Sequence, residues 1–413
     1  MTANQGPRPV PKWELRLGKF GQALFLAFAA AFVGAGGILF ALVVLLDIQE
    51  IDSTTKLDAK TLFDLVKLSF GVVAGAGALV ALVVAYRRQH VDEVGAHREA
   101  IRLHSERFSQ AVDRLGSDSP AVRLGGVHAL AGLADDAPDD SLRQTCIDVL
   151  CAYLQLPFTP DPGDGPADQD EHHRYLAFRN VRHTILRLIG DHYRRPRGTH
   201  RSWQGCDLDL TGVTIDGKMD FRGAVFSDGA VSFSGATFSC PTVSSFEGAA
   251  FSGSAVSFVG AEFSRGGVSF DGAAFSGGRV SFSEAVFSGG MVTFQGAVFS
   301  GGEVSFLLTV FSDGIVFFNG AVFSGSTVSF QQARFRASGT VIFDYATFSD
   351  GTVSFRHAEL ADRTVSFRVP VFSDGMVLFD DVRGSAPDGL LSAVGTTGSA
   401  GVSLPPAWLT PNP

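Results

Sequence analysis

A phrase of about a dozen residues recurs through the second half of this 413-residue chain. In the copy FQGAVFSGGEVSF at residues 294–306, a phenylalanine opens the unit, a second phenylalanine follows five residues later, and a valine stands five residues after that. The opening phenylalanine returns at steps of twelve residues, or of thirteen at two places: Phe221, Phe233, Phe246, Phe258, Phe270, Phe282, Phe294, Phe306, Phe318, Phe330, Phe343, Phe355, Phe367 and Phe379. A fixed period repeated this often predicts a solenoid.

Each unit supplies two short strands and two corners. Ala297 and Phe299 lie two residues apart, as do Val304 and Phe306, so each pair points to one side of a strand. The Gly and Ser residues between the pairs permit tight turns. A turn of twelve residues would leave too little room for two phenylalanine rings, so we expect a four-sided tube with about 24 residues per turn. The following side chains are expected in its core: Phe221, Phe226, Phe258, Phe263, Phe270, Phe275, Phe282, Phe287, Phe294, Phe299, Val304 and Phe306.

The segments AVFSD at residues 224–228, AVFSG at 297–301 and LDLTG at 208–212 share a spacing of small or apolar residue, Phe or Leu, then Ser or Thr. This spacing resembles the pentapeptide repeat, whose central Leu or Phe and preceding small residue fill a right-handed, four-sided β-helix. The whole chain is also similar to a group of actinobacterial membrane-anchored proteins, in which a two-span anchor and VRLGGVHALAGLADD precede AxFSGGxVSF repeats. Two extra residues per twelve interrupt strict pentads here. The resemblance implies an all-β solenoid over residues 205–383.

Two long apolar runs precede the repeats. The hydrophobic content of 45% is high for a soluble protein and indicates a membrane-embedded part. Residues 20–46 form a run without charge, long enough to cross about 30 Å of hydrocarbon, so we expect a first transmembrane helix there. A second apolar run, from Leu68 to Tyr86, places the second expected span at residues 66–86. A secretory signal peptide has a shorter apolar core, which argues against cleavage.

Lysine and arginine residues set the expected topology. Four of them lie in the N-terminal segment 1–19, two follow the second span at Arg87 and Arg88, and two lie in the loop 47–65 between the spans. Cytoplasmic segments carry the excess of Lys and Arg. We therefore expect a two-span protein of the cell membrane with both termini in the cytoplasm.

Residues 90–200 change to the period of amphipathic helices and predict a small all-α connector. The sequence GSDSP at residues 116–120 separates two of its helices, with Ser119 as the expected cap and Pro120 at the first helical position. The last helix, at about residues 171–194, is rich in Arg and His. We interpret it as a solvated polar face above an apolar stripe.

Some basic residues are candidates for contact with lipid phosphates: Arg87, Arg88, Arg174 and Arg179. Cys146 and Cys151 lie on an apolar helix face and are expected to be core residues, because no cysteine pair has the spacing of a zinc or redox site. No metal and no cofactor is expected.

The two ends of the solenoid need covering, since an open end exposes strand edges and core. At the first turn, which begins near CDLDLTGVTI at residues 206–215, we expect the helical connector to do this. Residues 384–413 drop the period and are either a flexible tail or a C-terminal cap. In the second case Leu390, Leu391 and Trp408 are the expected capping side chains.

The repeat contains no recognisable catalytic group. Its serines form a row without a nearby histidine base, so no enzyme activity is expected. We expect a membrane-anchored, non-enzymatic interaction scaffold on the cytoplasmic face, with an unidentified protein partner, the lipid bilayer and no nucleic acid; a monomer and a homo-oligomer both stay open. One alternative, implied by the resemblance, is a DNA-mimicking modulator of gyrase, although residues 221–383 carry only fourteen Asp or Glu against nine Lys or Arg. The other alternative is a component of an oligomeric channel or transport assembly.

Overall fold

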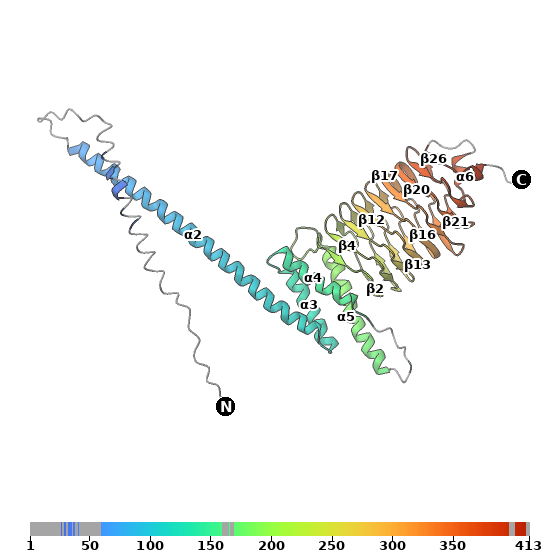
Figure 1. Ribbon diagram of the computed structural model, residues 1–413, viewed down its shortest axis with the longest axis horizontal. Coiled ribbons are helices and arrows are strands. Elements are labelled where there is room, and N and C mark those ends of the chain that lie inside the picture. Colours follow the sequence, from blue (N-terminus) through green and yellow to red (C-terminus); the bar gives the residue numbers. More distant parts are fainter. Residues whose placement is uncertain are drawn as a thin grey trace. The chain divides into compact units, whose positions relative to one another are not determined.

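The computed structural model in Figure 1 describes residues 59–158, 165, 169–395 and 401–409, together with residues 26, 29, 32–34, 36, 37 and 40. The chain divides into two compact units, Met1–Glu99 and Ala100–Pro413. The predicted segment 1–19 lies outside the described residues, as do most of the predicted span 20–46 and of the loop 47–65. In the described part of the chain, no helix combines the length and the apolar character that a membrane crossing requires.

Helix α2 (Ala59–Leu115) contains the second predicted span, residues 66–86, and continues without a break into the predicted connector. The predicted bounds of the span, 66–86, and of the connector, 90–200, therefore both fall within this one helix. The helix continues because residues 87–115 contain no proline and Gly95 as their one glycine. Within the second unit, its last turns bring Ala111 and Leu115 into the core.

Three further helices complete the connector: α3 (Pro120–Asp135), α4 (Asp140–Gln155) and α5 (Gln169–Tyr193). Ser119 occupies the N-cap position of α3, but its side chain forms no capping hydrogen bond, so its predicted capping role was wrong. Helix α3 lies so close to α2 that a Cβ atom on Gly126 would be 2.6 Å from the backbone nitrogen of Leu115. Glycine is therefore required at this crossing.

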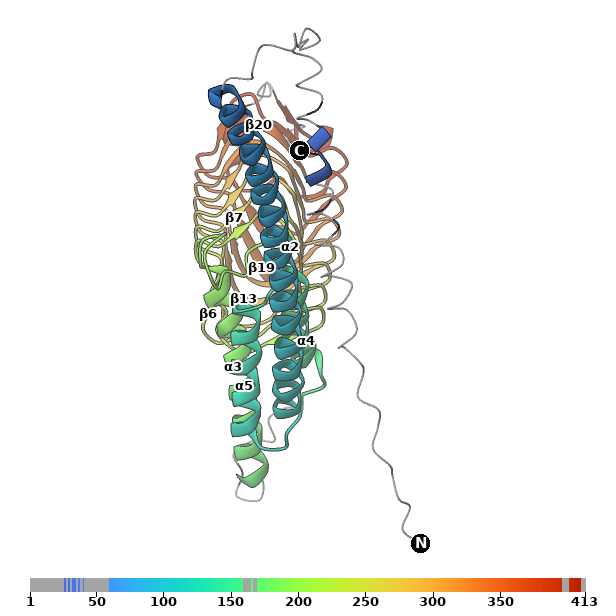
Figure 2. The ribbon, with the colours of Figure 1, turned by 90° about the vertical axis from the view of Figure 1, so that its left-hand side faces the viewer.

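The repeats fold into a β-solenoid of parallel strands, whose turns stack along one axis (Figures 1 and 2). The described strands form two wrapped sheets of 14 and 12 strands, and each sheet covers two of the four faces. We number the faces in the order in which the chain visits them from β3 onward. Face 1 consists of β3 (Val225–Phe226), β7 (Ala250–Phe251), β11 (Ala274–Phe275), β14 (Val298–Phe299), the first parts of β17 (Val322–Ser329) and β20 (Thr347–Ser354), and β23 (Val371–Phe372). Face 2 consists of β1 (Leu208–Asp209), β4 (Ala230–Ser232), β8 (Ala255–Ser257), β12 (Arg279–Ser281), β15 (Glu303–Ser305), the last parts of β17 and β20, β24 (Met376–Leu378) and β26 (Val402–Ser403).

The second sheet supplies the other two faces. Face 3 consists of β2 (Thr214–Ile215), β5 (Thr237–Phe238), β9 (Glu262–Phe263), the first parts of β13 (Val286–Thr293) and β16 (Val310–Phe317), β18 (Arg334–Phe335), β21 (Glu359–Leu360) and β25 (Arg383–Gly384). Face 4 consists of β6 (Val243–Ser245), β10 (Gly267–Ser269), the last parts of β13 and β16, β19 (Gly339–Ile342) and β22 (Val365–Ser366). The long strands β13, β16, β17 and β20 each bend around a corner and join two faces.

The strand register fixes the length of a turn. Val256 pairs with Val280, and Val280 pairs with Val304, so each of these turns consists of two twelve-residue units. The step from Val328 to its partner Val353 is one residue longer, because the sequence period there lengthens from twelve to thirteen. The four-sided tube with two units per turn is therefore the one expected from the sequence.

The four corners of a turn are of two kinds. In the corner that follows FSG, Gly302 has a φ of +70°, and a Cβ atom there would lie 2.5 Å from the carbonyl oxygen of Gly278 in the preceding turn. In the corner that follows VSF, Gly296 has a φ of +63°, and a Cβ atom would have no neighbour within 4 Å. Glu284 and Leu308 adopt the same backbone conformation in other turns, with φ of +60° and +58°. A Cβ atom is therefore excluded at Gly302 and tolerated at Gly296. Ser254 and Ser326 occupy the first kind of corner in other turns, without a positive φ.

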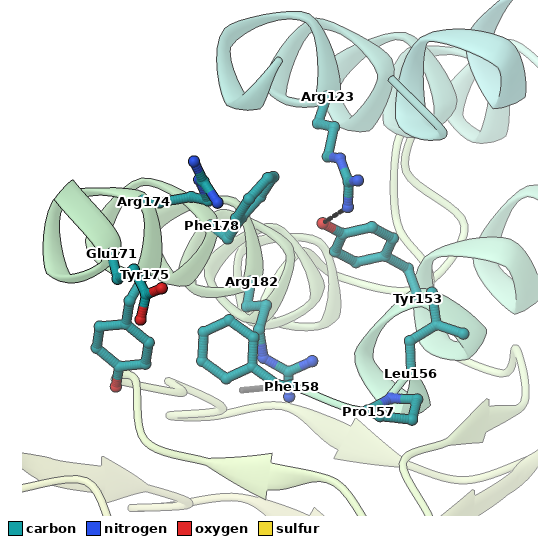
Figure 3. Close-up of a pocket in the computed structure, with 10 residues that line it drawn as sticks. All are labelled: Arg123, Tyr153, Leu156, Pro157, Phe158, Glu171, Arg174, Tyr175, Phe178 and Arg182. Carbon is teal, nitrogen blue, oxygen red and sulfur yellow. Dashed lines mark hydrogen bonds between the residues drawn. The ribbon is translucent and has the colours of Figure 1, made fainter. Parts of the chain in front are cut away.

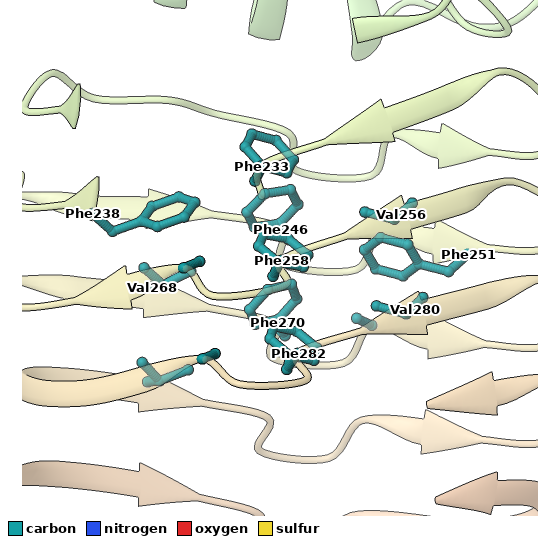
Figure 4. Close-up of a cluster of buried hydrophobic side chains, with 14 of the residues drawn as sticks. Phe233, Phe238, Phe246, Phe251, Val256, Phe258, Val268, Phe270, Val280 and Phe282 are labelled. Atoms are coloured by element: carbon teal, nitrogen blue, oxygen red, sulfur yellow. The ribbon is translucent and has the colours of Figure 1, made fainter. Parts of the chain in front are cut away.

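Stacked phenylalanine rings fill the tube. Rings one turn apart stack face to face, as Phe270 and Phe294 do with centroids 4.8 Å apart and an interplanar angle of 5°. This distance matches the spacing of neighbouring strands, about 4.8 Å, so the rings can stack in contact without any change in the hydrogen-bonded strand spacing. Rings half a turn apart, such as Phe270 and Phe282, meet edge to face at 5.7 Å and 86°, which is a favoured aromatic geometry. Figure 4 shows Phe233, Phe246, Phe258, Phe270 and Phe282 following one another along the centre of the solenoid.

Both ends of the solenoid are covered. At the first turn, the ring of Tyr193 at the end of α5 lies 5.6 Å from the rings of both Phe221 and Phe226. At the last turn, the described tail forms α6 (Leu390–Val394), β26 and α7 (Pro406–Leu409). Leu390 is buried, and Trp408 lies 5.5 Å from Phe379 while its indole nitrogen donates to the Gly384 carbonyl at 2.9 Å. Of the two expectations for this tail, the described residues form the cap, except that Leu391 stays exposed.

Candidate functional site

The predicted core residues of the solenoid all face inward. The twelve side chains from Phe221 to Phe306 that were expected in the interior are each at most 2% exposed. They are almost completely buried and therefore support the shape of the surface without offering a binding site. Any site on the solenoid must be built from the residues between them.

The outward positions of the strands divide the solenoid into a charged and an uncharged half. Outside the corners, the strands of face 4 and face 1 contain no Asp, Glu, Lys or Arg, and these two faces are neighbours across one corner. Face 4 presents an apolar row in which Val243, Met291 and Ile315 are 44%, 45% and 41% exposed. Gly267 occupies the rung between Val243 and Met291, so the row is continuous along the ladder.

The strands of face 2 and face 3 carry charges that pair between successive turns. On face 2, Arg279 lies 2.9 Å from Glu303. On face 3, Arg334 lies 3.8 Å from Glu359. These pairs are exposed and contribute little to stability. They distinguish the strands of these two faces from the uncharged strands of face 4 and face 1.

The serine hydroxyls along face 2 and its corner form hydrogen bonds between turns. The hydroxyl groups of Ser234 and Ser257 lie 2.8 Å apart, and those of Ser283 and Ser305 lie 2.9 Å apart. Each pair joins one turn to the next on the outside of the tube. These hydroxyls therefore serve the ladder as part-buried cross-links.

The junction between α5 and the first turn contains a carboxylate with two basic partners. Asp216 accepts a hydrogen bond of 2.7 Å from Nε of Arg179, and the ring Nε2 of His183 lies 3.2 Å away. Burial alone would raise the pKa of Asp216, but the hydrogen bonds from His183 and Arg179 outweigh it and lower the pKa to about 2. The carboxylate is therefore ionised at neutral pH and ties α5 to the solenoid.

A cavity of about 400 Å³ lies beside the connector helices. Figure 3 shows that its walls come from α3, from the end of α4 with the residues after it, and from the first half of α5. Its lining consists of Arg123, Tyr153, Leu156, Pro157, Phe158, Glu171, Arg174, Tyr175, Phe178 and Arg182. Three guanidinium groups and four aromatic rings thus share one concave surface with a single carboxylate.

The four basic residues predicted to face lipid lie in different surroundings. Arg87 and Arg88 are exposed on α2, in the first unit of the chain. Arg174 is exposed at the cavity, whereas Arg179 is held by Asp216. Contact of any of the four with lipid stays a prediction.

Arg182 is the residue that the interpretation of the last connector helix missed. That helix was assigned a solvated polar face, yet Arg182 is only 4% exposed. The sequence spacing does indicate burial, since Arg182 precedes the buried Ile185 and Ile189 by three and seven residues and so lies on the apolar stripe of the helix. His192, at the other end of the same helix, is also buried.

The cysteines of the connector are core residues. Cys146 is 0% exposed and Cys151 is 2% exposed, and burial raises the pKa of both thiols to about 12. Burial also raises the pKa of Cys206 to about 11. Among the residues that the structure describes, no cluster of three or more His, Cys, Asp or Glu side chains has the arrangement of a metal site.

Comparisons with known proteins add little to this account. No protein-family model matches the chain, and no curated protein matches it. Three chains of solved structures do match. One is full-length QnrB1, a plasmid-mediated fluoroquinolone resistance protein, with 17% identity over 42% of this chain and 90% of that chain and a TM-score of 0.15. At this TM-score the match carries no argument, so the assignment of a β-solenoid rests on the parallel register and the stacked phenylalanine rings.

Proposed function

We propose that the chain is a non-enzymatic interaction scaffold, built on a pentapeptide-repeat-like solenoid and tethered to the cell membrane with both termini in the cytoplasm. The observation that carries this proposal is the uncharged half of the solenoid, formed by face 4 and face 1. Charged residues are depleted at the centres of protein interfaces, where apolar and aromatic residues are enriched. The strands of these two faces show the corresponding lack of charge, although the corner that joins them carries Asp220, Arg222, Glu247, Asp271, Asp344 and Arg368.

Rigidity supports the same function. The ladder and the stacked rings hold the row from Val243 to Ile315 in one conformation, so a partner would bind with little loss of conformational freedom in the scaffold. A surface without acidic residues in its strands also does not resemble the phosphate rows of DNA. The gyrase alternative therefore receives no support from these two faces.

A pair of matched substitutions tests the scaffold. Ile315 and Thr327 both occupy the exposed position before an inward valine, Ile315 on face 4 and Thr327 on face 2. After crosslinking in native membranes, Ile315→Lys should lose the proteins that co-purify with the wild-type chain, and Thr327→Lys should keep them. Identical recoveries from both variants, or no partner of the wild-type chain, would refute the proposal.

The membrane anchor is supported by the apolar runs at residues 20–46 and 68–86 and by the Lys and Arg residues that flank them. Its test is cysteine labelling from outside intact cells. A cysteine introduced at Ser53 should react with an impermeant maleimide, and one introduced at Ser373 should not. Labelling at Ser373 alone would reverse the orientation, and labelling at neither site would argue against the pair of spans.

A further inference from the structure

The cavity beside the connector helices has the chemistry of an anion site. It contains Arg123, Arg174 and Arg182 against Glu171, a formal excess of two positive charges. None of the three guanidinium groups forms an ion pair with a carboxylate in the part of the chain that the structure describes. Such an excess on a concave surface attracts an anion.

Arg182 is the group that makes this a built site. Its guanidinium donates to the carbonyl oxygen of Leu154 at 2.8 Å and to that of Thr214 at 3.4 Å, but Nε is buried and has no partner among the described residues. Burial lowers the pKa of this guanidinium, because the charged form has lost water. The nearby carboxylate of Asp216 favours the charged form, but the guanidinium hydrogen-bonds only to neutral oxygens, and an anion in the cavity would offset the remaining cost of burial.

The other two arginines lie at different depths. Arg123 is half-buried; it donates to the hydroxyl of Tyr153 at 3.0 Å, and its guanidinium carbon lies 4.6 Å from the ring centroid of Phe178. This stacking fixes the plane of the guanidinium and leaves its remaining N–H groups in a defined direction. Arg174 is exposed at the cavity and is free of described partners, so it can move onto a bound ligand.

The aromatic residues define the rest of the ligand. The rings of Phe158 and Tyr175 stack with centroids 5.2 Å apart, and the guanidinium of Arg182 lies 4.9 Å from the Phe158 centroid. Planar groups stack well on such surfaces, and arginine forks match the geometry of phosphate. The volume of about 400 Å³ is within the range of small-molecule sites.

We infer that this cavity binds a phosphate monoester carried on a planar ring, with the chemistry of a nucleoside monophosphate. The phosphate would meet Arg174 and Arg182 while the base stacks on the aromatic wall. A lipid headgroup offers the phosphate without the planar ring, so the aromatic wall favours the nucleotide. This site is independent of the scaffold surface on face 4 and face 1.

Calorimetric titration of the full-length protein in detergent tests the inference. Adenosine 5′-monophosphate should bind, and adenosine and inorganic phosphate should each bind at least about tenfold more weakly, since each satisfies only part of the site. Arg174→Ala should weaken binding of the nucleotide about tenfold, because it removes a charge-assisted contact from an exposed side chain that the fold does not need. Arg174→Lys should recover part of the loss.

The matched control is Arg187→Ala, which removes the same charge from α5 at an exposed residue outside the cavity lining. It should bind the nucleotide as the wild-type protein does. Equal losses in both variants would reduce the effect to general electrostatics and overturn the site. Absence of nucleotide binding at millimolar concentration, or binding to vesicles of anionic lipid that the nucleotide does not compete with, would also overturn it.

Discussion

The two kinds of corner provide a sharp test of the solenoid, because alanine is introduced at a positive φ in both. Gly302 and Gly296 lie in the same repeat and have φ of +70° and +63°. They differ in what an added Cβ would meet: the carbonyl oxygen of Gly278 at 2.5 Å in the first case, and nothing within 4 Å in the second. Gly302→Ala should therefore destabilise the protein much more than Gly296→Ala.

The left-handed conformation costs alanine roughly 1–2 kcal/mol at either position. Part of this is recovered because alanine has less freedom than glycine in the unfolded chain, by about 0.4–1 kcal/mol. Gly296→Ala should thus lower the free energy of unfolding by about 1 kcal/mol. Gly302→Ala must in addition move two turns apart, and overpacking of this kind costs about 1–3 kcal/mol more.

Urea unfolding of the two full-length variants, followed by circular dichroism, measures the difference. The unfolding midpoint of Gly302→Ala should fall well below that of Gly296→Ala, which should stay near the wild-type value. The presence of Glu284 and Leu308 in the equivalent corner of other turns supports the second expectation. Equal losses for the two variants would mean that the turns do not approach as closely as the structure describes.

Three further predictions follow from the packing and the ionisable groups. Phe294→Ala removes a ring that stacks on both Phe270 and Phe318 and leaves a cavity, so the free energy of unfolding in urea should fall by about 3–5 kcal/mol. A fall below about 1 kcal/mol would contradict a closely packed interior. Because the pKa of Asp216 is lowered to about 2, its contribution to stability is complete above about pH 4 and is lost as the pH falls through 2. The wild-type protein should therefore lose about 1–2 kcal/mol more than Asp216→Asn between pH 5 and pH 2, after allowance for partial exposure, and parallel pH profiles would exclude this role. Cys146, whose pKa is raised to about 12 by burial, should react with iodoacetamide in the folded protein far more slowly than after unfolding in urea; equal rates would show that the connector core is open.

The period of the repeat was enough to predict the inside of the solenoid. Residues spaced by two within a strand must share a side, and two phenylalanine rings per unit require a wide turn, so the inward positions followed from Phe294, Phe299, Val304 and Phe306 alone. The cap at the last turn was one of two expectations, because a tail without a period does not reveal whether it packs. The buried Leu390 and the indole of Trp408 decide it for the described residues.

The division of the surface into a charged and an uncharged half was missed, although its signal was present. Arg279 and Glu303 are two units apart in the sequence, as are Met291 and Ile315, so each pair repeats on one face once the turn contains two units. The expected turn already contained two units, but the outward residues of alternate units were not compared with each other. The cavity was missed for a different reason, since it joins residues from three helices and its key residue, Arg182, was assigned to a solvated face by its charge.

Site-specific photocrosslinking shows whether the uncharged half of the solenoid binds a protein partner. A photoreactive phenylalanine analogue at Ile315 on face 4, in native membranes, should give an adduct of one defined mass. The same analogue at Thr327 on face 2 should give none. Equal adducts from both positions, or none from Ile315, would contradict the account.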